Sequence, residues 1–246
     1  MDRSVLRDDM VDSLEHESKG CLQSDAISVA MRSVPRHVFL TDDQSAYADR
    51  PFERYGTRVL APSTVARLLE ALRAEDGDSV LIVGAGVGYT AAVLAEIVGG
   101  RKVHAIDITR RVVYAARDHL EAAGYDEVLV DCRDGVSGFP EYAPYDRILL
   151  EAAAVRPPQA LLDQLTENGR LVMPLGAQTQ SLATVDASGT VERLGGCAFR
   201  PMLVDGEQAG TLERNRTHRE DREFAQRDAQ RRRGWELEWI DWEQTD

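Results

Sequence analysis

The sequence predicts an α/β fold built on a mostly parallel sheet, with helices on both of its faces and an antiparallel hairpin at its end. Between residues 79 and 173, apolar runs of strand length alternate with helical segments, which is the pattern of parallel strands joined by crossover helices. The first of these runs ends in three glycines at alternate positions. Polar and apolar residues then alternate over 181–185 and 190–199, which is typical of a hairpin.

The chain of 246 residues divides into three segments. Residues 1–75 are expected to form a helical cap packed on the core, residues 76–205 the α/β core, and residues 206–246 a charged extension. In the extension, residues 213–233 mix arginines with acids and predict a solvated helix, while residues 235–239 alternate like a short strand. The tryptophans there pack either on the chain's own surface or in an oligomer contact.

The cap combines helices with a covering segment. Residues 33–56 lack periodicity and contain aromatic residues and prolines, which indicates an ordered segment able to roof a cleft. Apolar spacing predicts cap helices at about 5–14, 27–31 and 64–72, with Gly20 separating the first two, Pro35 ending the second and Ser63 as the N-cap of the third.

In the core, the loops after the parallel strands are expected to meet at one edge of the sheet, because ligands of open α/β sheets bind at the carboxyl ends of the strands. Those loops contain Gly84 to Gly88, Asp107, Asp134 with Gly135, and Glu151. The predicted core strands are 79–84, 102–106, 127–132, 146–150 and 170–173, and the predicted helices are 90–98, 110–123 and 158–165.

Residues 79–107 form the βαβ unit around which the function is predicted. Gly84, Gly86 and Gly88 permit positive φ and let backbone N–H groups approach a ligand, beside the N-terminus of a helix. Asp107 lies 23 residues beyond Gly84, near the spacing at which an acid closing the second strand accepts hydrogen bonds from ribose hydroxyls. A ligand that contains a nucleoside is therefore expected.

The glycine spacing also indicates which nucleoside ligand binds. A dinucleotide fingerprint, G-x-G-x-x-G, would need glycine at Tyr89, whereas this chain has G-x-G-x-G. Pyrophosphate binding is therefore disfavoured, and S-adenosylmethionine (SAM), which has no phosphate, is the expected cofactor. The alternative is a tight strand-to-helix turn followed by a solvent-exposed Asp.

Charge composition bears on partners and on location. The formal net charge is −13, which argues against a nucleic acid or an anionic membrane as partner. Lys19 and Lys102 are the only lysines, so almost every cation is Arg, and acids outnumber cations by 42 to 29. Such an acidic excess is expected of a protein from a cytoplasm with molar salt; the alternative is an ordinary acidic cytosolic protein.

Cysteine usage and the N-terminus indicate a soluble cytoplasmic protein. Cys21, Cys132 and Cys197 are far apart and include no C-x-x-C pair, which suits a reducing compartment and predicts no structural metal site. The N-terminus is charged from Asp2 onward, unlike a secretory signal. The longest uncharged run, 79–95, is interrupted by glycines and shorter than a membrane span.

Several stretches together resemble one family, the protein-L-isoaspartate O-methyltransferases, which use SAM to methylate the free carboxylate of damaged isoaspartyl residues. The most specific are Val80-Leu-Ile-Val-Gly-Ala-Gly-Val-Gly-Tyr-Thr-Ala-Ala-Val-Leu-Ala95 and Pro140-Glu-Tyr-Ala-Pro-Tyr-Asp-Arg147. The resemblance covers roughly residues 25–203, and its other pieces are 34–39, 47–51, 61–62, 134–135, 152–154, 169–174 and 199–203.

This resemblance implies a Rossmann-like class I methyltransferase fold, with SAM in the glycine cleft. It places Asp107 on the ribose and Asp134 with Gly135 near the adenine. The alternative for Asp134 is a solvent-exposed acid in a turn. A damaged isoaspartyl protein or peptide is the implied substrate.

The chain departs from the family pattern at three places. The family usually has Glu at Asp107 and a small or neutral residue at Glu151. Before Pro62 the family carries a Gly-Gln-Thr-Ile-Ser signature, whose Ser is regarded as its active-site residue. This chain has Gly56-Thr-Arg-Val-Leu60, so Leu60 stands at the Ser position.

Two classes of function follow. The first is an isoaspartate-type carboxyl methyltransferase, including one with a different carboxylate substrate. The second is a SAM-binding relative without transferase activity, acting as a sensor or partner-binding module. Arg58, in the altered signature, is the candidate residue for binding the substrate carboxylate through two parallel hydrogen bonds. The alternative is a surface Arg58 paired with a nearby acid such as Glu53.

Overall fold

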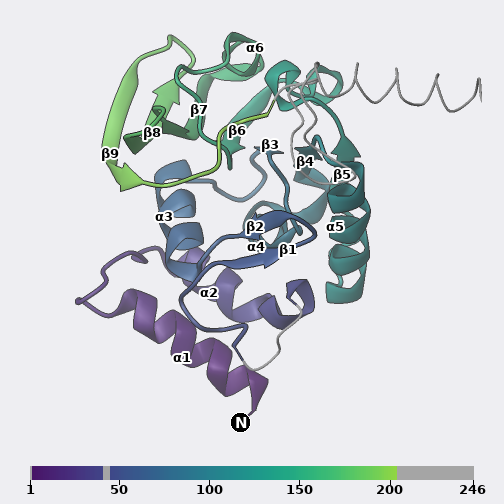
Figure 1. Cartoon of the computed structure of the whole chain (residues 1–246), viewed down its shortest axis with the longest axis vertical. Coiled ribbons are helices and arrows are strands. Elements are labelled where there is room, and N and C mark those ends of the chain that lie inside the picture. The colour runs from purple at the N-terminus through teal and green to yellow at the C-terminus, as the bar shows by residue number, and fades with distance from the viewer. Residues whose placement is uncertain (1, 41–44, 204–246) are drawn as a thin grey trace, which may run out of the picture. The chain divides into compact units, whose positions relative to one another are not determined.

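The computed structural model describes residues 2–40 and 45–203, and Met1–Met202 form one compact unit. The main sheet consists of β3 (Val80–Val83), β4 (Val103–Asp107), β5 (Leu129–Cys132), β6 (Tyr145–Leu150), β7 (Leu165–Leu175), β8 (Gln180–Asp186) and β9 (Val191–Cys197). These seven strands lie in the order β5-β4-β3-β6-β7-β8-β9 (Figure 1). Neighbouring strands from β5 to β7 pair in parallel. Strand β8 pairs antiparallel with both β7 and β9. The predicted α/β fold with a terminal hairpin is confirmed.

Helices pack on both faces of this sheet. Val80 and Ile82 of β3 belong to the larger core cluster, with residues of the first five helices. Leu81 and Val83 point the other way and share a second cluster with Leu161 of the sixth helix. The helices are α1 (Arg3–Glu15), α2 (Asp25–Ser33), α3 (Pro62–Leu72), α4 (Tyr89–Val98), α5 (Arg110–Ala123) and α6 (Gln159–Leu162). None of the helices in the described ranges is long and apolar enough to cross a membrane.

Two expectations about helices are wrong. The helix predicted over 158–165 is the single turn α6, because the chain pairs with β6 from Leu165 onward and the Tyr145 N–H donates to the Gln164 carbonyl (2.8 Å). Ladder hydrogen bonds thus override helical spacing there. Ser63 is not an N-cap; α3 begins at Pro62, and the Ser63 N–H donates to Asp49 Oδ1 (2.9 Å).

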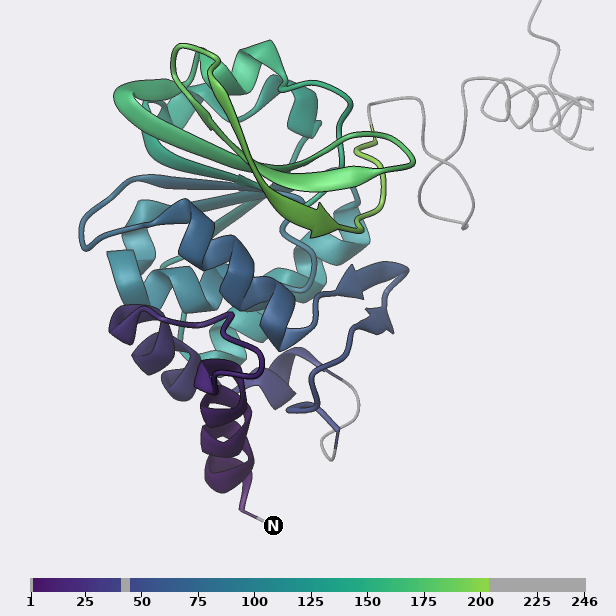
Figure 2. The same ribbon diagram turned by 90° about the vertical axis from the view of Figure 1, so that its left-hand side faces the viewer.

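The predicted covering segment contains regular structure as well. It includes a 3₁₀ turn, Arg36–Phe39, and the strand β1 (Phe52–Arg54). Strand β1 pairs antiparallel with β2 (Thr57–Val59), and this hairpin stands apart from the main sheet (Figure 2). The segments predicted over 213–233 and 235–239 lie outside the described residues.

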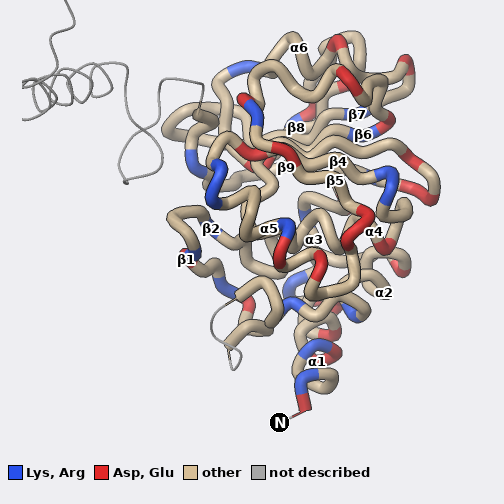
Figure 3. The backbone as a smooth tube through the Cα atoms, turned by 90° about the vertical axis from the view of Figure 1, so that its right-hand side faces the viewer, with Lys and Arg blue, Asp and Glu red and all other residues tan. Residues whose placement is uncertain are grey.

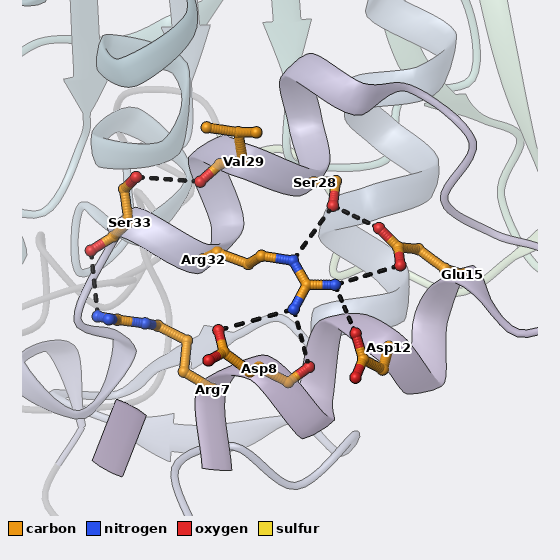
Figure 4. A network of polar contacts seen from close by, with 8 residues as sticks. All are labelled: Arg7, Asp8, Asp12, Glu15, Ser28, Val29, Arg32 and Ser33. Atoms are coloured by element: carbon orange, nitrogen blue, oxygen red, sulfur yellow. Dashed lines mark hydrogen bonds and ion pairs between the residues drawn. The ribbon is translucent and has the colours of Figure 1, made fainter. Parts of the chain in front are cut away.

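A polar network joins the first two helices, α1 and α2 (Figure 4). The Arg32 guanidinium of α2 donates to Asp12 Oδ1 (2.5 Å) and Glu15 Oε2 (3.2 Å) of α1. Asp8 adds a third carboxylate, 3.6 Å from Arg32 Nη1. Because one cation serves three acids on one helix face, the network holds α1 against α2 while reducing repulsion within α1.

Candidate functional site

The loop after β3 has the conformation that its glycines allow. Gly84, Gly86 and Gly88 have φ values of 92°, 53° and 93°, in the region that residues with a Cβ rarely adopt. The N–H groups of Gly84 and Ala85 donate to the Ile106 carbonyl at 2.8 and 3.0 Å, which fixes the loop beside β4. Helix α4 begins directly afterwards, with Gly88 as its N-cap. The loop therefore places a helix N-terminus at the carboxyl edge of the sheet.

Asp107, the last residue of β4, holds this loop. Its carboxylate accepts hydrogen bonds from the Gly86 N–H (3.2 Å) and the Thr109 N–H (2.9 Å). Burial raises the pKa of Asp107, and these hydrogen bonds act in the opposite direction. Asp107 and the glycine loop are thus in contact, as their positions in the sequence predict.

Asp134 and Gly135 follow β5 at the same edge. Asp134 Oδ1 accepts from the Val136 N–H (2.9 Å), so this side chain caps a 3₁₀ turn. Gly135 is buried against β3, and a Cβ there would lie 2.4 Å from Val83 Cγ1. Only a residue without a side chain allows this close approach to the end of β3.

Glu151, directly after β6, lies on the other side of the glycine loop. Its N–H donates to the Val83 carbonyl (2.8 Å), and its Cβ would be 3.6 Å from a Cβ on Gly84. Its Oε1 is inaccessible to solvent and has no hydrogen-bond partner among the described residues. Burial, with a smaller contribution from the Asp107 charge, raises the pKa of Glu151 to about 7, against the lowering effect of a hydrogen bond with Thr90.

The β1–β2 hairpin lies over the glycine loop. Thr57 Oγ1 is 4.0 Å from the position that a Cβ on Gly86 would take. The Tyr55 ring packs on His119, with centroids 6.0 Å apart, and His119 Nδ1 lies 3.1 Å from the Val87 carbonyl. The β1–β2 hairpin therefore lies against the glycine loop and against the helix α5 that packs beside it.

Arg58 is exposed on β2, directly opposite Glu53 of β1. Glu53 is paired with a different arginine: Arg200 Nη2 lies 2.8 Å from Glu53 Oε2, and Arg200 Nη1 donates to the Gly56 carbonyl (2.8 Å). Within residues 2–40 and 45–203, the Arg58 side chain makes no hydrogen bond or ion pair. In the alternative interpretation Arg58 pairs with an acid such as Glu53, but Glu53 pairs with Arg200 instead.

Leu60 stands at the position of the family's Ser, and a buried arginine holds its backbone carbonyl. The side chain of Arg36 is fully buried and donates to the carbonyls of Leu60 (2.7 Å) and Ala46 (2.9 Å). The Arg36 guanidinium also lies 4.4 Å above the ring of Tyr89, the first residue of α4. These contacts fix the path of the chain at residue 60 through its backbone carbonyl. They do not depend on which side chain residue 60 has.

Sequence reasoning placed the loops after the parallel strands at one edge but missed three residues whose contacts hold the β1–β2 hairpin and the chain after it over the glycine loop. His119 had no signal beyond its residue type, because its contacts join segments that are distant in the chain. Arg36 and Arg200 stand in the stretches 34–39 and 199–203 that resemble the family, and that was their only signal. Across the described part of the chain, no group of His, Cys, Asp and Glu side chains gathers as a metal site would require.

Comparison with known proteins agrees with this geometry. Residues 6–207 match the model of the protein-L-isoaspartate(D-aspartate) O-methyltransferase family. The chain belongs to this family. A protein-L-isoaspartate O-methyltransferase of Methanococcoides burtonii is 41% identical over 182 residues, which cover 71% of this chain and 90% of that protein. One of Archaeoglobus fulgidus is 39% identical over 213 residues, covering 84% of this chain and 96% of that protein.

Solved structures of the same family share the fold. One protein-L-isoaspartate O-methyltransferase superposes with a TM-score of 0.71 at 26% identity, covering 83% of this chain and 66% of that one. A Plasmodium falciparum structure assigned to the same enzymes, in complex with S-adenosyl-L-homocysteine, has a TM-score of 0.72 at 20% identity. It covers 80% of this chain and 98% of its own.

Glu151 should make stability depend on pH. The pKa of Glu151 in the folded protein is above its ordinary value of about 4.3. The contribution of its protonation to the free energy of unfolding is therefore complete below about pH 4.3 and is lost as pH rises through about 7. Glu151→Gln removes this loss. We expect the variant to gain about 2 to 3 kcal/mol over the unmodified protein between pH 5 and pH 8, measured by urea unfolding without ligand. Asp107 is present in both proteins, so its own titration cancels to first order in the comparison. Parallel pH curves for the two proteins would contradict the assignment.

Proposed function

We propose that this protein is a SAM-dependent carboxyl methyltransferase that methylates isoaspartyl residues of damaged proteins. The observation that carries the proposal is the meeting of the glycine loop, Asp107 and Gly135 at one edge of the sheet, under the hairpin, in a member of this family. Membership alone indicates the reaction class. The local contacts support a cofactor site in this chain.

The residues at this edge fit SAM. The glycine loop has no side chains that would fill the space beside Asp107, and Asp107 supplies carboxylate oxygens for ribose hydroxyls. Asp107, Asp134 and Glu151 make the edge acidic, which disfavours a ligand with phosphates and favours one with positive charge. Asp134 and Gly135 are proposed to lie at the adenine.

SAM supplies, when bound, an electrophilic methyl group on a sulfonium. The isoaspartyl carboxylate is ionised at neutral pH, so the protein needs no general base and acts by positioning the acceptor and excluding water. Leu60 suits this role because an apolar side chain keeps water out where the family has a hydroxyl. The proposed task of Arg58 is to hold the acceptor, since its guanidinium is exposed on the hairpin while Arg200 neutralises Glu53.

The direct test incubates the protein with an isoaspartyl peptide and labelled SAM, and measures volatile methanol released from the methyl ester. The same peptide with ordinary Asp is the control. Transfer to the isoaspartyl peptide alone supports the proposal. SAM binding without transfer to any carboxylate would instead support the non-catalytic binding module, for which the substitution at Leu60 is the motivating observation.

Asp107→Asn should weaken SAM binding by about 1 to 3 kcal/mol, because the amide loses charged hydrogen bonds to the ribose and turns a donor towards one of the N–H groups that Asp107 now satisfies. Isothermal titration calorimetry measures the change. Asp9→Asn on α1 is a matched control, since Asp9 is exposed on the first helix of the cap. Equal affinities of Asp107→Asn and the unmodified protein would remove Asp107 from the site.

Arg58→Ala should lower methyl transfer to the isoaspartyl peptide by about ten- to a hundredfold, equivalent to about 1.5 to 3 kcal/mol of charged hydrogen bonding, and leave SAM affinity unchanged. The control is Arg101→Ala, an exposed arginine paired with Glu127 far along the chain from the hairpin. Equal transfer rates for Arg58→Ala and the unmodified protein would show that Arg58 is a solvent-exposed residue with no role in methyl transfer.

We further propose that the protein works in a reducing, salt-rich cytoplasm. Cys132 is an exposed free thiol, which suits a reducing compartment. Acids outnumber cations by 42 to 29 in the sequence, and acidic and basic positions are interspersed along the described backbone in the view of Figure 3. The free energy of unfolding should therefore rise as KCl is increased from millimolar to molar concentrations, measured by thermal unfolding. Greatest stability at low salt would contradict this proposal.

A further inference from the structure

Among the three acids of this edge, Asp107 and Asp134 have proposed places at the ribose and the adenine, and Glu151 has no ligand group assigned to it. The sheet order places Asp134 after β5, Asp107 at the end of β4, the glycine loop after β3 and Glu151 after β6. Asp107 and Glu151 therefore flank the glycine loop, about 10 Å apart along the edge if adjacent strands are about 4.8 Å apart. A ligand with its adenine at β5 and its ribose at β4 directs its remaining end towards β6.

The Glu151 carboxylate has no cationic partner among the described residues. Thr90, in the first turn of α4, lowers the pKa of Glu151 by hydrogen bonding, whereas the charge of a second acid, Asp107, raises it. Oε1 is shielded from solvent and lacks a donor. In the described ranges, neither Asp107 nor Glu151 forms an ion pair. A buried acceptor without a partner is costly, so this atom suits a ligand that brings a charged N–H donor.

We propose that the Glu151 carboxylate binds the α-ammonium group of the cofactor's methionine moiety. This inference rests on the proposed function. The ammonium is favoured over the sulfonium for two reasons: the sulfonium is bonded to the ribose carbon and so belongs beside Asp107, and it has no N–H to donate to Oε1. The carboxyl group thereby becomes a determinant of affinity for SAM and its demethylated product, both of which carry the ammonium.

Binding has a consequence for protons. Near pH 7 part of the ligand-free protein holds Glu151 as a neutral carboxyl, with the elevated pKa described above. An ammonium group that contacts the carboxylate favours the ionised form, so the carboxyl proton passes to the buffer as the ligand binds. Burial also raises the pKa of Asp107, on the other side of the same loop, and Asp107 is present in both proteins compared. Comparison of Glu151→Gln with the unmodified protein separates the two contributions.

The test compares three ligands by calorimetry: SAM, S-adenosylhomocysteine and 5′-methylthioadenosine, which lacks the amino-acid end. Glu151→Gln should weaken SAM and S-adenosylhomocysteine by about ten- to a hundredfold and leave 5′-methylthioadenosine within about twofold. Proton release on SAM binding, from titrations in buffers of different ionisation enthalpy at pH 6.5, should be smaller in the variant. Glu151→Thr is a second variant, and Glu121→Gln, on an exposed position of α5, is the control.

Each other outcome overturns the inference. Equal weakening of all three ligands would mean that the substitution acts through packing of the loop. Weakening of SAM alone would assign Glu151 to the sulfonium. Unchanged affinities would leave Glu151 outside the cofactor site, while the proposed function would stand. Absence of SAM binding by the unmodified protein would overturn the proposed function itself.

Discussion

The structure depends on the close hydrogen bonding of the central strand β3 to its two parallel neighbours at their carboxyl ends. The Ile106 carbonyl of β4 accepts from Gly84 and Ala85, and the Val83 carbonyl of β3 accepts from Glu151. The Arg133 N–H extends the pattern by donating to the Asp107 carbonyl (3.0 Å). These bonds bring loops that are separated by dozens of residues to one edge, because parallel strands must end on the same side.

A second set of contacts fixes the hairpin over that edge. Arg200 holds the hairpin through Glu53 and the Gly56 carbonyl, while Arg36 holds the chain after β2 through the Leu60 carbonyl. Burial lowers the pKa of Arg36, so this guanidinium carries a desolvation cost that carbonyls and the Tyr89 ring offset. Because these anchors act largely through backbone carbonyls, side chains in the altered signature can change while the path of the chain is retained.

The electrostatic character of the edge follows from the same arrangement. Asp107 and Glu151 lie on either side of a loop that has no cationic side chain, and burial raises the pKa of both. Two acids in a shielded site favour a cationic ligand over an anionic one, since each carboxylate is more stable beside a positive charge. The β1–β2 hairpin carries an exposed positive charge at Arg58, where an acidic acceptor is proposed to approach.

The sequence by itself determined the parallel core, the terminal hairpin, the glycine turn and the placement of Asp107, Asp134 and Gly135 at one edge. These depend on local periodicity and on the rule that strand ends meet, so they need no knowledge of distant contacts. Only the tertiary structure decided that β7 begins at Leu165, that Glu53 pairs with Arg200, and that Glu151 Oε1 is buried without a donor. The reason is that strand pairing, ion pairing and desolvation are set by residues far apart in the chain, whose approach no local pattern encodes.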